Sequence, residues 1–470
     1  MKRASDPESA RQRDAGPGLA AREKVGYALG DTASNFYWKT FEFFVVIFYT
    51  DVFGLSPGAV GTMLLCTRVL DAVADPLMGL LADRTSTRWG KFRPYLLWMS
   101  LPLAGAGLLA FTVPARLHGG ARLAYAYATY ALLMLCYTAI NIPYSALLGV
   151  ITGSSAERTR LSAVRFIGAF AGGLFVQKAT LDLVRLCGGG DAARGWTCTM
   201  AVYGAAAVLL FAVCFTLTHE RVTPPRGQTG AVRADLRALV GDGPFAILFA
   251  LAALIIVAFW LRGGGAAYYF RYYLGRERAL GWFLASGGLA SVVGVAATGL
   301  LTRRAGKRAL YRTLMAGAGL LMLAQLALPP GQMAAVFALN VVVCLLLGPV
   351  APLIWAMFAD VADHVEWKTG RRTTALVFAG GLFAMKLGGA LGGWALGRLL
   401  ELFGYQANAA QSPTALHGIV LAFTAVPGVV CLAAALVAGG YSLDEAAVVS
   451  VERDLAGRRA ATAPAPAATA

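Results

Sequence analysis

Several charged side chains interrupt the long apolar segments of this chain, and two of them are spaced for chemistry. Asp71 and Asp75 lie four residues apart within the apolar segment 58–82, so in a helix both carboxylates project from one face. Hard cations such as Na⁺ and Li⁺ prefer oxygen ligands, and repulsion between two close carboxylates favours a proton on one of them. The pair therefore predicts a site for Na⁺, Li⁺ or H⁺. The alternative is a structural pair neutralised by Arg68 and another base.

The charged residues expected inside the apolar segments include more cations than anions. The cations are Lys39, Arg68, Arg165, Arg262 and Lys386, and the anions are Glu42, Asp71 and Asp75. A charged side chain inside a membrane costs about 2.5–3.5 kcal/mol on insertion scales, which makes each a functional candidate. The excess of cations favours a substrate that carries a carboxylate or phosphate, such as a hexuronide. A neutral glycoside is the alternative, because Asn and Arg side chains also bind hydroxyl groups.

Some of these groups have structural alternatives. Lys39 and Glu42 are three residues apart and can pair on one helix face. Arg262 precedes the run GGGAAYYF, where the glycines would let backbones approach or the helix break. Near the middle of its segment, Arg262 would need a carboxylate partner or an anionic substrate. Asp31 lies near the start of the first segment and is expected at the cytoplasmic interface.

The elements that must position these side chains are apolar helices. Of the 470 residues, 58% are hydrophobic and 14% are charged, whereas soluble domains carry about 25% charged residues. A helix needs about 20 apolar residues to cross a bilayer. The chain offers twelve such segments, at 27–50, 58–82, 95–115, 122–150, 161–186, 199–218, 245–273, 279–302, 309–328, 333–362, 373–400 and 414–440. This pattern predicts an all-α membrane protein with twelve transmembrane helices and argues against an ordinary soluble enzyme.

The distribution of Lys and Arg predicts how these segments are oriented. The formal net charge is +16, but basic residues gather in alternate connections, such as 84–93 and 303–308, while DVFGLSPG and PPGQ have none. Cytoplasmic loops retain Lys and Arg, so both termini are expected inside. The sequence has no basic face interleaved with aromatic residues, which argues against a nucleic-acid partner. The expected partners are the lipid bilayer and a small molecule.

The longest connection divides the segments into two halves of six. We expect a cytoplasmic tail at 1–23, a first six-helix bundle at 24–218, a cytoplasmic loop at 219–243, a second bundle at 244–440 and a disordered tail at 441–470. GLLADR at 79–84 and GLLTRRAGKR at 299–308 occupy matching places in the two halves. Their positions indicate a weak internal repeat.

The seven cysteines do not form a disulfide scaffold. Cys187 and Cys198 flank the polar segment GGGDAARGWT, which the predicted orientation places outside. A disulfide there would require an oxidising compartment, and the sequence leaves this open. The other five cysteines lie in apolar segments, where Cys behaves as a small hydrophobe.

Five stretches, in chain order, carry a resemblance to a known family. They are YTDVFGLSPGAVGTMLL (49–65), TRVLDAVADPLMG (67–79), RWGKFRPY (88–95), YTAINIPYSALLGVIT (137–152) and ADVADHVEWKTGRR (359–372). Together with the repeat, they resemble the glycoside–pentoside–hexuronide:cation symporters of the major facilitator superfamily, of the melibiose-permease-like type. The resemblance implies two six-helix bundles around a midplane cavity that opens alternately to either side.

The resemblance implies roles for the acidic pair. Asp71 and Asp75 match the family's cation-site acids, and Thr138 matches its hydroxyl ligand. Ala74 stands where the melibiose permease pattern has an amide, so one ligand is missing. Na⁺ could bind at Asp71 and Asp75, but the missing ligand favours H⁺.

The resemblance also implies a substrate pocket that departs from the family pattern. Asn35 and Asn141 stand where the melibiose permease has sugar-binding carboxylates, and Ser145 stands where it has a stacking aromatic. These departures predict a different substrate. Arg165 and Lys386 match basic residues of the family's sites. The alternatives are an interhelical hydrogen bond for each Asn and snorkelling to an interface for each base.

Charged residues at the cytoplasmic ends are expected to form a gate. They are Asp83, Arg84, Asp360, Asp363 and Arg371, together with the basic cluster 303–308. Ion pairs between the two bundles would hold an outward-open state and break on opening inward. The alternative is a solvated loop.

The expected function is symport of a sugar or glycoside with H⁺ or Na⁺ across the plasma (inner) membrane, by a monomer that needs no cofactor. A cation bound at the acidic pair would raise the affinity for substrate. A lysolipid or another organic anion is the alternative substrate for the same fold. The sequence has no P-loop or HExxH pattern, and neither an ATP-driven pump nor a membrane-embedded enzyme is expected.

Overall fold

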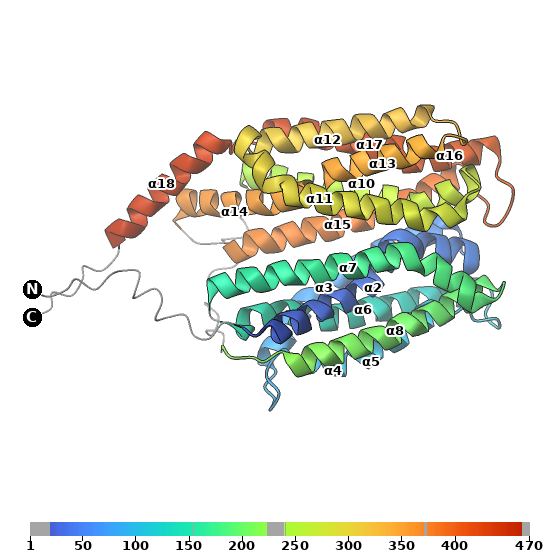
Figure 1. Ribbon diagram of the computed structural model, residues 1–470, viewed down its shortest axis with the longest axis horizontal. Coiled ribbons are helices and arrows are strands. Elements are labelled where there is room, and N and C mark those ends of the chain that lie inside the picture. Colours follow the sequence, from blue (N-terminus) through green and yellow to red (C-terminus); the bar gives the residue numbers. More distant parts are fainter. Residues whose placement is uncertain (1–18, 153, 223–238, 240, 371–373, 463–470) are drawn as a thin grey trace, which may run out of the picture. The chain divides into compact units, whose positions relative to one another are not determined.

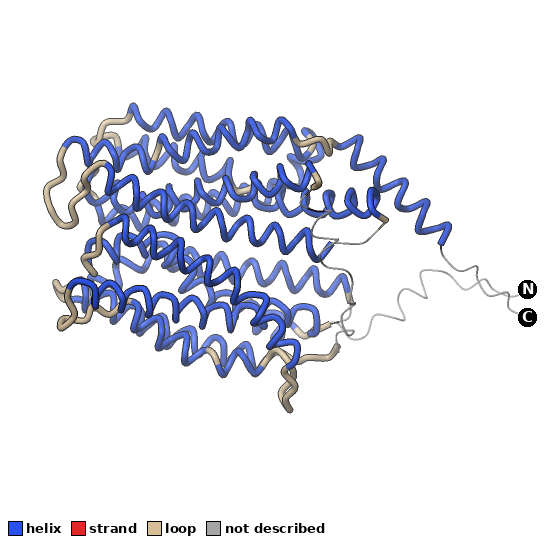
Figure 2. Tube along the Cα trace, turned by 180° about the vertical axis from the view of Figure 1, so that it is seen from behind, coloured by secondary structure: helices blue, strands red, loops and turns tan. Residues whose placement is uncertain are grey.

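The computed structural model describes residues 19–152, 154–222, 239, 241–370 and 374–462. Within these residues the regular elements are helices joined by loops (Figures 1 and 2). The first half of the chain contains α2 (Ala21–Ile47), η1 (Phe48–Val52), α3 (Pro57–Arg84), α4 (Pro94–Trp98), α5 (Ser100–Ala110), α6 (Gly119–Ile151), α7 (Ser155–Gly188) and α8 (Ala192–Leu217). The second half contains α10 (Gly243–Tyr268), η2 (Tyr269–Tyr273), η3 (Glu277–Ala279), α11 (Leu280–Ala305), α12 (Lys307–Ala324), η4 (Gln325–Ala327), α13 (Met333–Leu347), α14 (Val350–Thr369), α15 (Thr374–Leu402), α16 (Pro413–Phe423), α17 (Ala425–Val437), η5 (Ala438–Gly440) and α18 (Glu445–Thr462).

Nine helices in the described part of the chain are long and apolar enough to cross a membrane. The predicted all-α class is therefore confirmed. The first two expected spans correspond to α2 and α3, which carry several of the charged residues considered above. The third corresponds to α4 and α5, a shorter apolar stretch over Pro94–Ala110.

The helix ends follow from local chemistry. Asp191 accepts hydrogen bonds from the Ala193 and Arg194 amides at the start of α8, and Ser412 accepts one from Ala415 at the start of α16. Such side chains satisfy amides that have no partner within the helix. α7 ends at Gly188 and is followed by Gly189 with φ of 57°, a left-handed conformation that glycine adopts without strain.

Contacts divide the chain into two compact units. The first unit comprises Met1–Phe41 and Val69–Gly227, and the second comprises Glu42–Arg68 and Gln228–Ala470. In the first unit α2 and α7 pack with their backbones close together. A Cβ atom added to Gly168 of α7 would lie 2.5 Å from the Ala28 carbonyl oxygen, so only glycine fits there without a shift.

The second unit includes a hairpin from the first half of the sequence, which is formed by the end of α2, η1 and the start of α3. Gly61 and Gly397 lie where α3 meets α15: a Cβ atom on Gly397 would lie 2.3 Å from the Pro57 carbonyl oxygen. Gly263 of α10 lies against Phe43 of α2. The glycine run after Arg262 therefore serves close packing, and α10 continues through it to Tyr268 without the break that was the other expectation.

The expected disorder of the tail 441–470 is wrong over Glu445–Thr462, which forms α18 (Figure 1). Val451 and Leu455 of this helix are buried. Asp454 accepts a hydrogen bond of 3.0 Å from the Trp367 indole of α14, and Arg458 donates one to the Trp367 carbonyl oxygen. Burial of an apolar face and these two polar contacts offset the entropy that ordering the tail costs.

Candidate functional site

The structure brings the acidic pair together with Thr138. The Thr138 hydroxyl of α6 donates a hydrogen bond of 2.7 Å to Oδ1 of Asp71, and its distance to Oδ1 of Asp75 is 3.4 Å. Both carboxylates lie on α3, with Asp71 buried at 2% exposure and Asp75 half-buried. The hydroxyl from α6 thus lies beside two carboxylates one turn apart on α3, and the cation-binding role of the three residues stays a prediction. Oxygen atoms from two helices converge at this point.

In both α3 and α6 a proline lies close in sequence to the group formed by Asp71, Asp75 and Thr138. α3 contains Pro76 and α6 contains Pro143. A proline cannot donate to the carbonyl four residues earlier, which leaves the carbonyl oxygens of Ala72 and Ala139 without that helical partner. Both oxygens belong to residues next to the polar group, so α3 and α6 have backbone acceptors there in addition to their side chains.

Arg68 was the base offered as a neutralising partner of the pair. It is buried, and its guanidinium lies over the Trp260 ring of α10, 5.5 Å from the ring centroid. That arrangement is a cation–π contact within the second unit.

Arg165 is paired with Asp31, a partner that the sequence analysis did not assign. Nε of Arg165 lies 2.9 Å from Oδ2 of Asp31, and the guanidinium lies over the Tyr144 ring at 5.1 Å. Asp31 is buried at 8% exposure. The carboxylate is thus enclosed and holds Arg165, while its expected position near the cytoplasmic interface stays a prediction. The same contact argues against simple snorkelling of Arg165.

The other expected pocket residues lie on α2 and α6. Asn35 donates a hydrogen bond of 2.9 Å to the Asp31 carbonyl oxygen one turn earlier, so this bond is within α2 and is not interhelical. Asn35, Lys39 and Asn141 are half-buried, and Ser145 is exposed. The aliphatic chain of Lys39 passes Gly173 of α7, where a Cβ atom would lie 3.4 Å from it.

Arg262 has neutral partners within the second unit. Its guanidinium donates to Oε1 of Gln325, Oδ1 of Asn340 and the Phe423 carbonyl oxygen at 3.2–3.3 Å, and it lies over the Phe423 ring. The residue is buried, with 8% of its surface exposed. The expectation that Arg262 needs a carboxylate partner or an anionic substrate is wrong in its first part, since three oxygen acceptors solvate the charge.

Lys386 lies on α15 and is half-buried. It belongs to the second unit, whereas Asp71, Asp75 and Thr138 belong to the first. Its proposed role near the acidic pair stays a prediction.

Two of the gate residues, Asp83 and Asp360, form ion pairs within their own units. Asp83 lies 2.9 Å from Nζ of Lys91 in the first unit. Asp360 of α14 accepts from Nζ of Lys307 of α12 at 2.6 and 2.7 Å in the second. These two pairs therefore join neighbouring segments of one half, and an inter-bundle role stays a prediction. Arg84 is exposed and Asp363 half-buried, while Arg371 lies outside the described residues.

A carboxylate that the sequence analysis did not select holds the RWGKFR turn. Glu220, just after α8, accepts hydrogen bonds of 2.7–2.9 Å from the backbone amides of Lys91, Phe92 and Arg93. Gly90 has φ of 111°, and a Cβ atom there would lie 2.6 Å from the Glu220 carboxyl. The turn is therefore shaped around this carboxylate. No spacing rule links residues that lie about 130 positions apart.

We expect Glu220→Gln to destabilise the first unit by about 2 kcal/mol, because hydrogen bonds to a charged acceptor are worth more than neutral ones. Thermal unfolding of the purified variant in detergent measures this as a lower melting temperature. Glu277→Gln is the matched control, because Glu277 is exposed. Equal melting temperatures for the two variants would contradict the anchoring role of Glu220.

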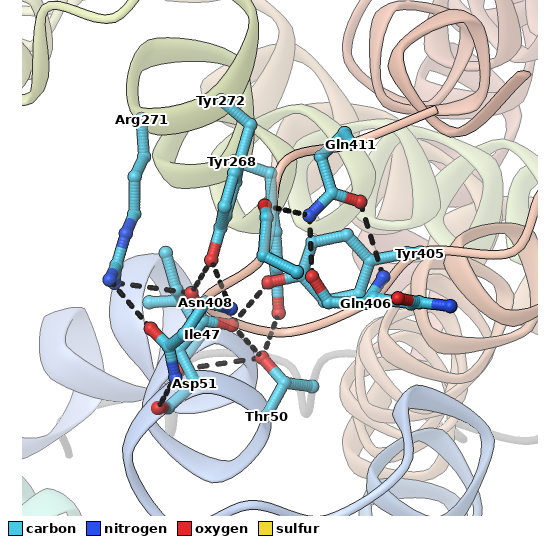
Figure 3. A network of polar contacts seen from close by, with 11 residues as sticks. Ile47, Thr50, Asp51, Tyr268, Arg271, Tyr272, Tyr405, Gln406, Asn408 and Gln411 are labelled. Atoms are coloured by element: carbon cyan, nitrogen blue, oxygen red, sulfur yellow. Dashed lines mark hydrogen bonds and ion pairs between the residues drawn. The ribbon is translucent and has the colours of Figure 1, made fainter. Parts of the chain in front are cut away.

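A second carboxylate outside the selected set is the most enclosed acid of the hairpin (Figure 3). The Asp51 side chain is 0% exposed and lies 3.1 Å from a guanidinium nitrogen of Arg271. It accepts hydrogen bonds from the hydroxyls of Thr50, Tyr272 and Tyr405. Burial raises the pKa of Tyr405, so this phenol stays protonated and acts as a donor. Four donors from three segments thus converge on one carboxylate.

Two further hydrogen bonds connect the segments around Asp51. The Thr50 hydroxyl lies 2.7 Å from the Tyr268 hydroxyl, and Asn408 donates from its side-chain amide to the Asp51 carbonyl oxygen. We call the set Asp51, Arg271, Tyr272, Tyr405 and Asn408 the Asp51 cluster. It joins η1 of the hairpin to η2 and to the loop after α15.

Comparison with known proteins identifies a matching family model and similar transporters. The family model described as MFS/sugar transport protein matches residues 26–445. The inner membrane symporter YicJ of Escherichia coli is 38% identical over 424 residues, which cover 90% of this chain and 92% of YicJ. The isoprimeverose transporter of Lactiplantibacillus pentosus is 33% identical and is aligned over 86% of this chain and 85% of its own.

A solved structure supports the fold independently. The crystal structure of a point mutant of the nucleoside transporter NupG aligns with a TM-score of 0.63 at 13% identity. The alignment covers 90% of this chain and 99% of that protein. At this identity the likeness concerns the fold alone.

Proposed function

We propose that this chain, which belongs to the MFS/sugar transport protein family and within it to the glycoside–pentoside–hexuronide:cation symporters, carries a sugar or glycoside together with H⁺ or Na⁺. The chain is a membrane transporter and not an enzyme. We further propose that it has twelve transmembrane helices in two bundles, that both termini lie on the cytoplasmic side of a bacterial inner membrane, and that the monomer is functional.

The observation that carries cation coupling is the convergence of Asp71, Asp75 and Thr138. A cation or proton at this point offsets the repulsion between the two carboxylates and joins α3 to α6. Ala74 supplies no side-chain ligand, but the carbonyl oxygens left free by Pro76 and Pro143 are acceptors in the same turns. Ligation of Na⁺ would draw on these carbonyls in addition to the side chains, and both ions stay in the proposal.

The proposed pocket is lined by α2, α6 and α7. Asn35 and Asn141 offer amide groups that both donate and accept, and Arg165 is oriented by Asp31 and by the Tyr144 ring. A sugar hydroxyl can bind each of these groups. Because α6 carries both Thr138 of the cation site and Asn141 of the pocket, an ion bound at one alters the helix that presents the other. Coupling of this kind is reciprocal.

The charges of the pocket favour a neutral glycoside over a uronide. Asp31 compensates Arg165, and Arg262 is enclosed among Gln325, Asn340 and Phe423. Two of the five cations that suggested an anionic substrate are thereby accounted for.

For the transport path to open to the outside, the hairpin must separate from the helices of the second half of the chain against which it packs. The predicted orientation places residue 50 and its neighbours at the outer surface. The Asp51 cluster and the glycine contacts between α3 and α15 hold the hairpin there. We infer that they close the outer end of the transport path, and that they separate whenever substrate enters from outside.

Uptake into proteoliposomes tests the function. Purified protein would be assayed with neutral disaccharides, uronides and a lysolipid under separate Na⁺ and H⁺ gradients. We expect a neutral glycoside to accumulate under one of the two gradients. Accumulation of a uronide alone would contradict the neutral pocket, and lysolipid uptake alone would contradict sugar transport.

We expect Arg165→Lys to raise the KM for the sugar by about tenfold, because an ammonium cannot keep the pairing with Asp31 and the stacking on Tyr144 together. Loss of one charge-assisted hydrogen bond is worth about 1.5–3 kcal/mol. The concentration of ion that gives half-maximal uptake should change much less. Arg185→Lys, at an exposed ion pair of the same helix, is the matched control. An unchanged KM in Arg165→Lys would remove this residue from the pocket.

A further inference from the structure

Two cysteine thiols meet where α7 and α8 are joined. The Cys187 side chain interacts with that of Cys198, and both residues are free thiols and half-buried. Cys187 lies in the last turn of α7, and Cys198 lies in the second turn of α8. These two residues are the ones that flank GGGDAARGWT in the sequence.

The helix backbones approach closely at this point. A Cβ atom on Gly195 of α8 would lie 2.2 Å from the Val184 carbonyl oxygen of α7, and one on Gly188 would lie 3.2 Å from the Gly195 Cα atom. Without Cβ atoms the two helices come into backbone contact, which brings the side chains three or four residues away face to face. A disulfide needs Cα atoms about 4.4–6.8 Å apart, and the close backbone approach at Gly188 and Gly195 favours such a separation for the neighbouring Cys187 and Cys198.

We propose that Cys187 and Cys198 form a disulfide that links the ends of α7 and α8 on the outer side of the membrane. The proposal depends on the topology given under the proposed function, because that topology places the turn outside the cytoplasm. A metal site is a weaker interpretation of the two thiols, since the described residues contain no group of three or more His, Cys, Asp or Glu side chains arranged to hold a metal.

The oxidant for this reaction is an extracytoplasmic thiol oxidase that carries a reactive disulfide. The thiolate of one cysteine attacks that disulfide and forms a mixed disulfide with the oxidase. The second thiolate then attacks the mixed bond, which forms the Cys187–Cys198 bond and releases the oxidase as a dithiol. Two thiol protons and two electrons leave the chain, and the oxidase disulfide accepts the electrons.

The linkage would act on a helix of the proposed pocket. Arg165 and Cys187 both lie on α7, and the turn at Gly189–Gly190 between α7 and α8 has positive φ at both glycines. A covalent bond at this end prevents α7 from sliding along α8 while the carrier changes state.

Thiol trapping tests the proposal. Cells are quenched in acid, free thiols are blocked with N-ethylmaleimide, and the denatured protein is reduced and labelled with a polyethylene glycol maleimide. Wild type is expected to gain two labels that appear only after reduction. Cys187→Ser and Cys198→Ser should each gain none, while Cys136→Ser, at a buried position, should still gain two. Absence of these labels in wild type would overturn the proposal.

Topology is tested separately, so that the two failures are distinguishable. In Cys198→Ser, a membrane-impermeant maleimide added to whole cells should label Cys187. Labelling from outside together with seven free thiols in wild type would overturn the disulfide and leave the transport proposal intact. Absence of outside labelling, with labelling after permeabilisation, would overturn the orientation and the disulfide together. Uptake by the same Cys198→Ser protein would show whether transport also fails.

Discussion

Asp75→Asn is expected to abolish ion-driven accumulation of the sugar while the protein still reaches the membrane. The variant keeps the size of the side chain but removes one of the two charges that a cation would neutralise beside Thr138. Without that charge, binding of the ion no longer alters the energy of α3 and α6. The accumulation ratio in proteoliposomes should fall to about one, the value of a carrier that only equilibrates its substrate.

Exchange of labelled for unlabelled sugar should survive in the same variant, because the proposed pocket residues are unchanged. Thr138→Val gives a graded comparison. It removes the hydroxyl that donates to Asp71, so we expect the ion concentration for half-maximal uptake to rise about tenfold or more. Asp182→Asn is the matched control, because Asp182 forms exposed ion pairs on α7. Full accumulation by Asp75→Asn would show that the coupling charge lies elsewhere.

The sequence predicts best what lies within one helix. Asp71 and Asp75 share a face because they are four residues apart, and this spacing needs no tertiary information. The resemblance added Thr138 from another helix, and the structure places its hydroxyl beside both carboxylates. The all-α class follows in the same way from the length and apolar character of the segments.

Partners from distant segments could not be predicted. Arg165 and Asp31 are separated by 134 positions, and each alone has the pattern of an interfacial charge. Arg262 is solvated by two amide oxygens and a backbone carbonyl. A carboxylate partner is visible in a sequence as a charge, whereas a backbone carbonyl leaves no mark there. Buried polar groups must be hydrogen-bonded, but that rule does not say by which residues.

The Asp51 cluster shows the same limit at the end of a helix. Asp51 follows an apolar segment and precedes a loop, where a carboxylate is ordinary. Its donors come from positions 271, 272 and 405, which are brought to it only by the packing of the hairpin on the second unit. A signal was nevertheless present, because YTD belongs to one of the stretches that resemble the family. That stretch contains no other charged residue.

Asp51→Asn is expected to shift the carrier towards a state that is open on the outer side. The substitution leaves Arg271 without its carboxylate and weakens the bonds from Tyr272 and Tyr405 (Figure 3). Breaking a buried ion pair costs about 3–5 kcal/mol, which corresponds to more than about a hundredfold change in the ratio of closed to open hairpin. Net uptake should fall, because transport requires the outer end to close in every cycle.

A reporter cysteine measures this shift directly. Leu64 is 2% exposed, and it lies against Gly393 of α15 within the hairpin contact, so Leu64→Cys should react with an impermeant maleimide only when the hairpin separates. The native cysteine at position 66 is exposed and would be replaced by Ser in all reporter proteins. Addition of Asp51→Asn should raise the labelling rate from outside at least about tenfold, whereas addition of Asp182→Asn should leave it unchanged.

A graded variant separates opening from misfolding. Tyr272→Phe removes one hydroxyl donor and keeps the pair between Asp51 and Arg271, so its labelling rate should lie between those of the parent and Asp51→Asn. Gel filtration and sugar exchange establish that each protein is folded. If Asp51→Asn is folded and its reporter reacts at the parent rate, the Asp51 cluster does not control the outer end. An intermediate rate for Tyr272→Phe would instead show that the closed state depends on the number of donors that the buried carboxylate retains, since each lost donor leaves more of its charge unsolvated.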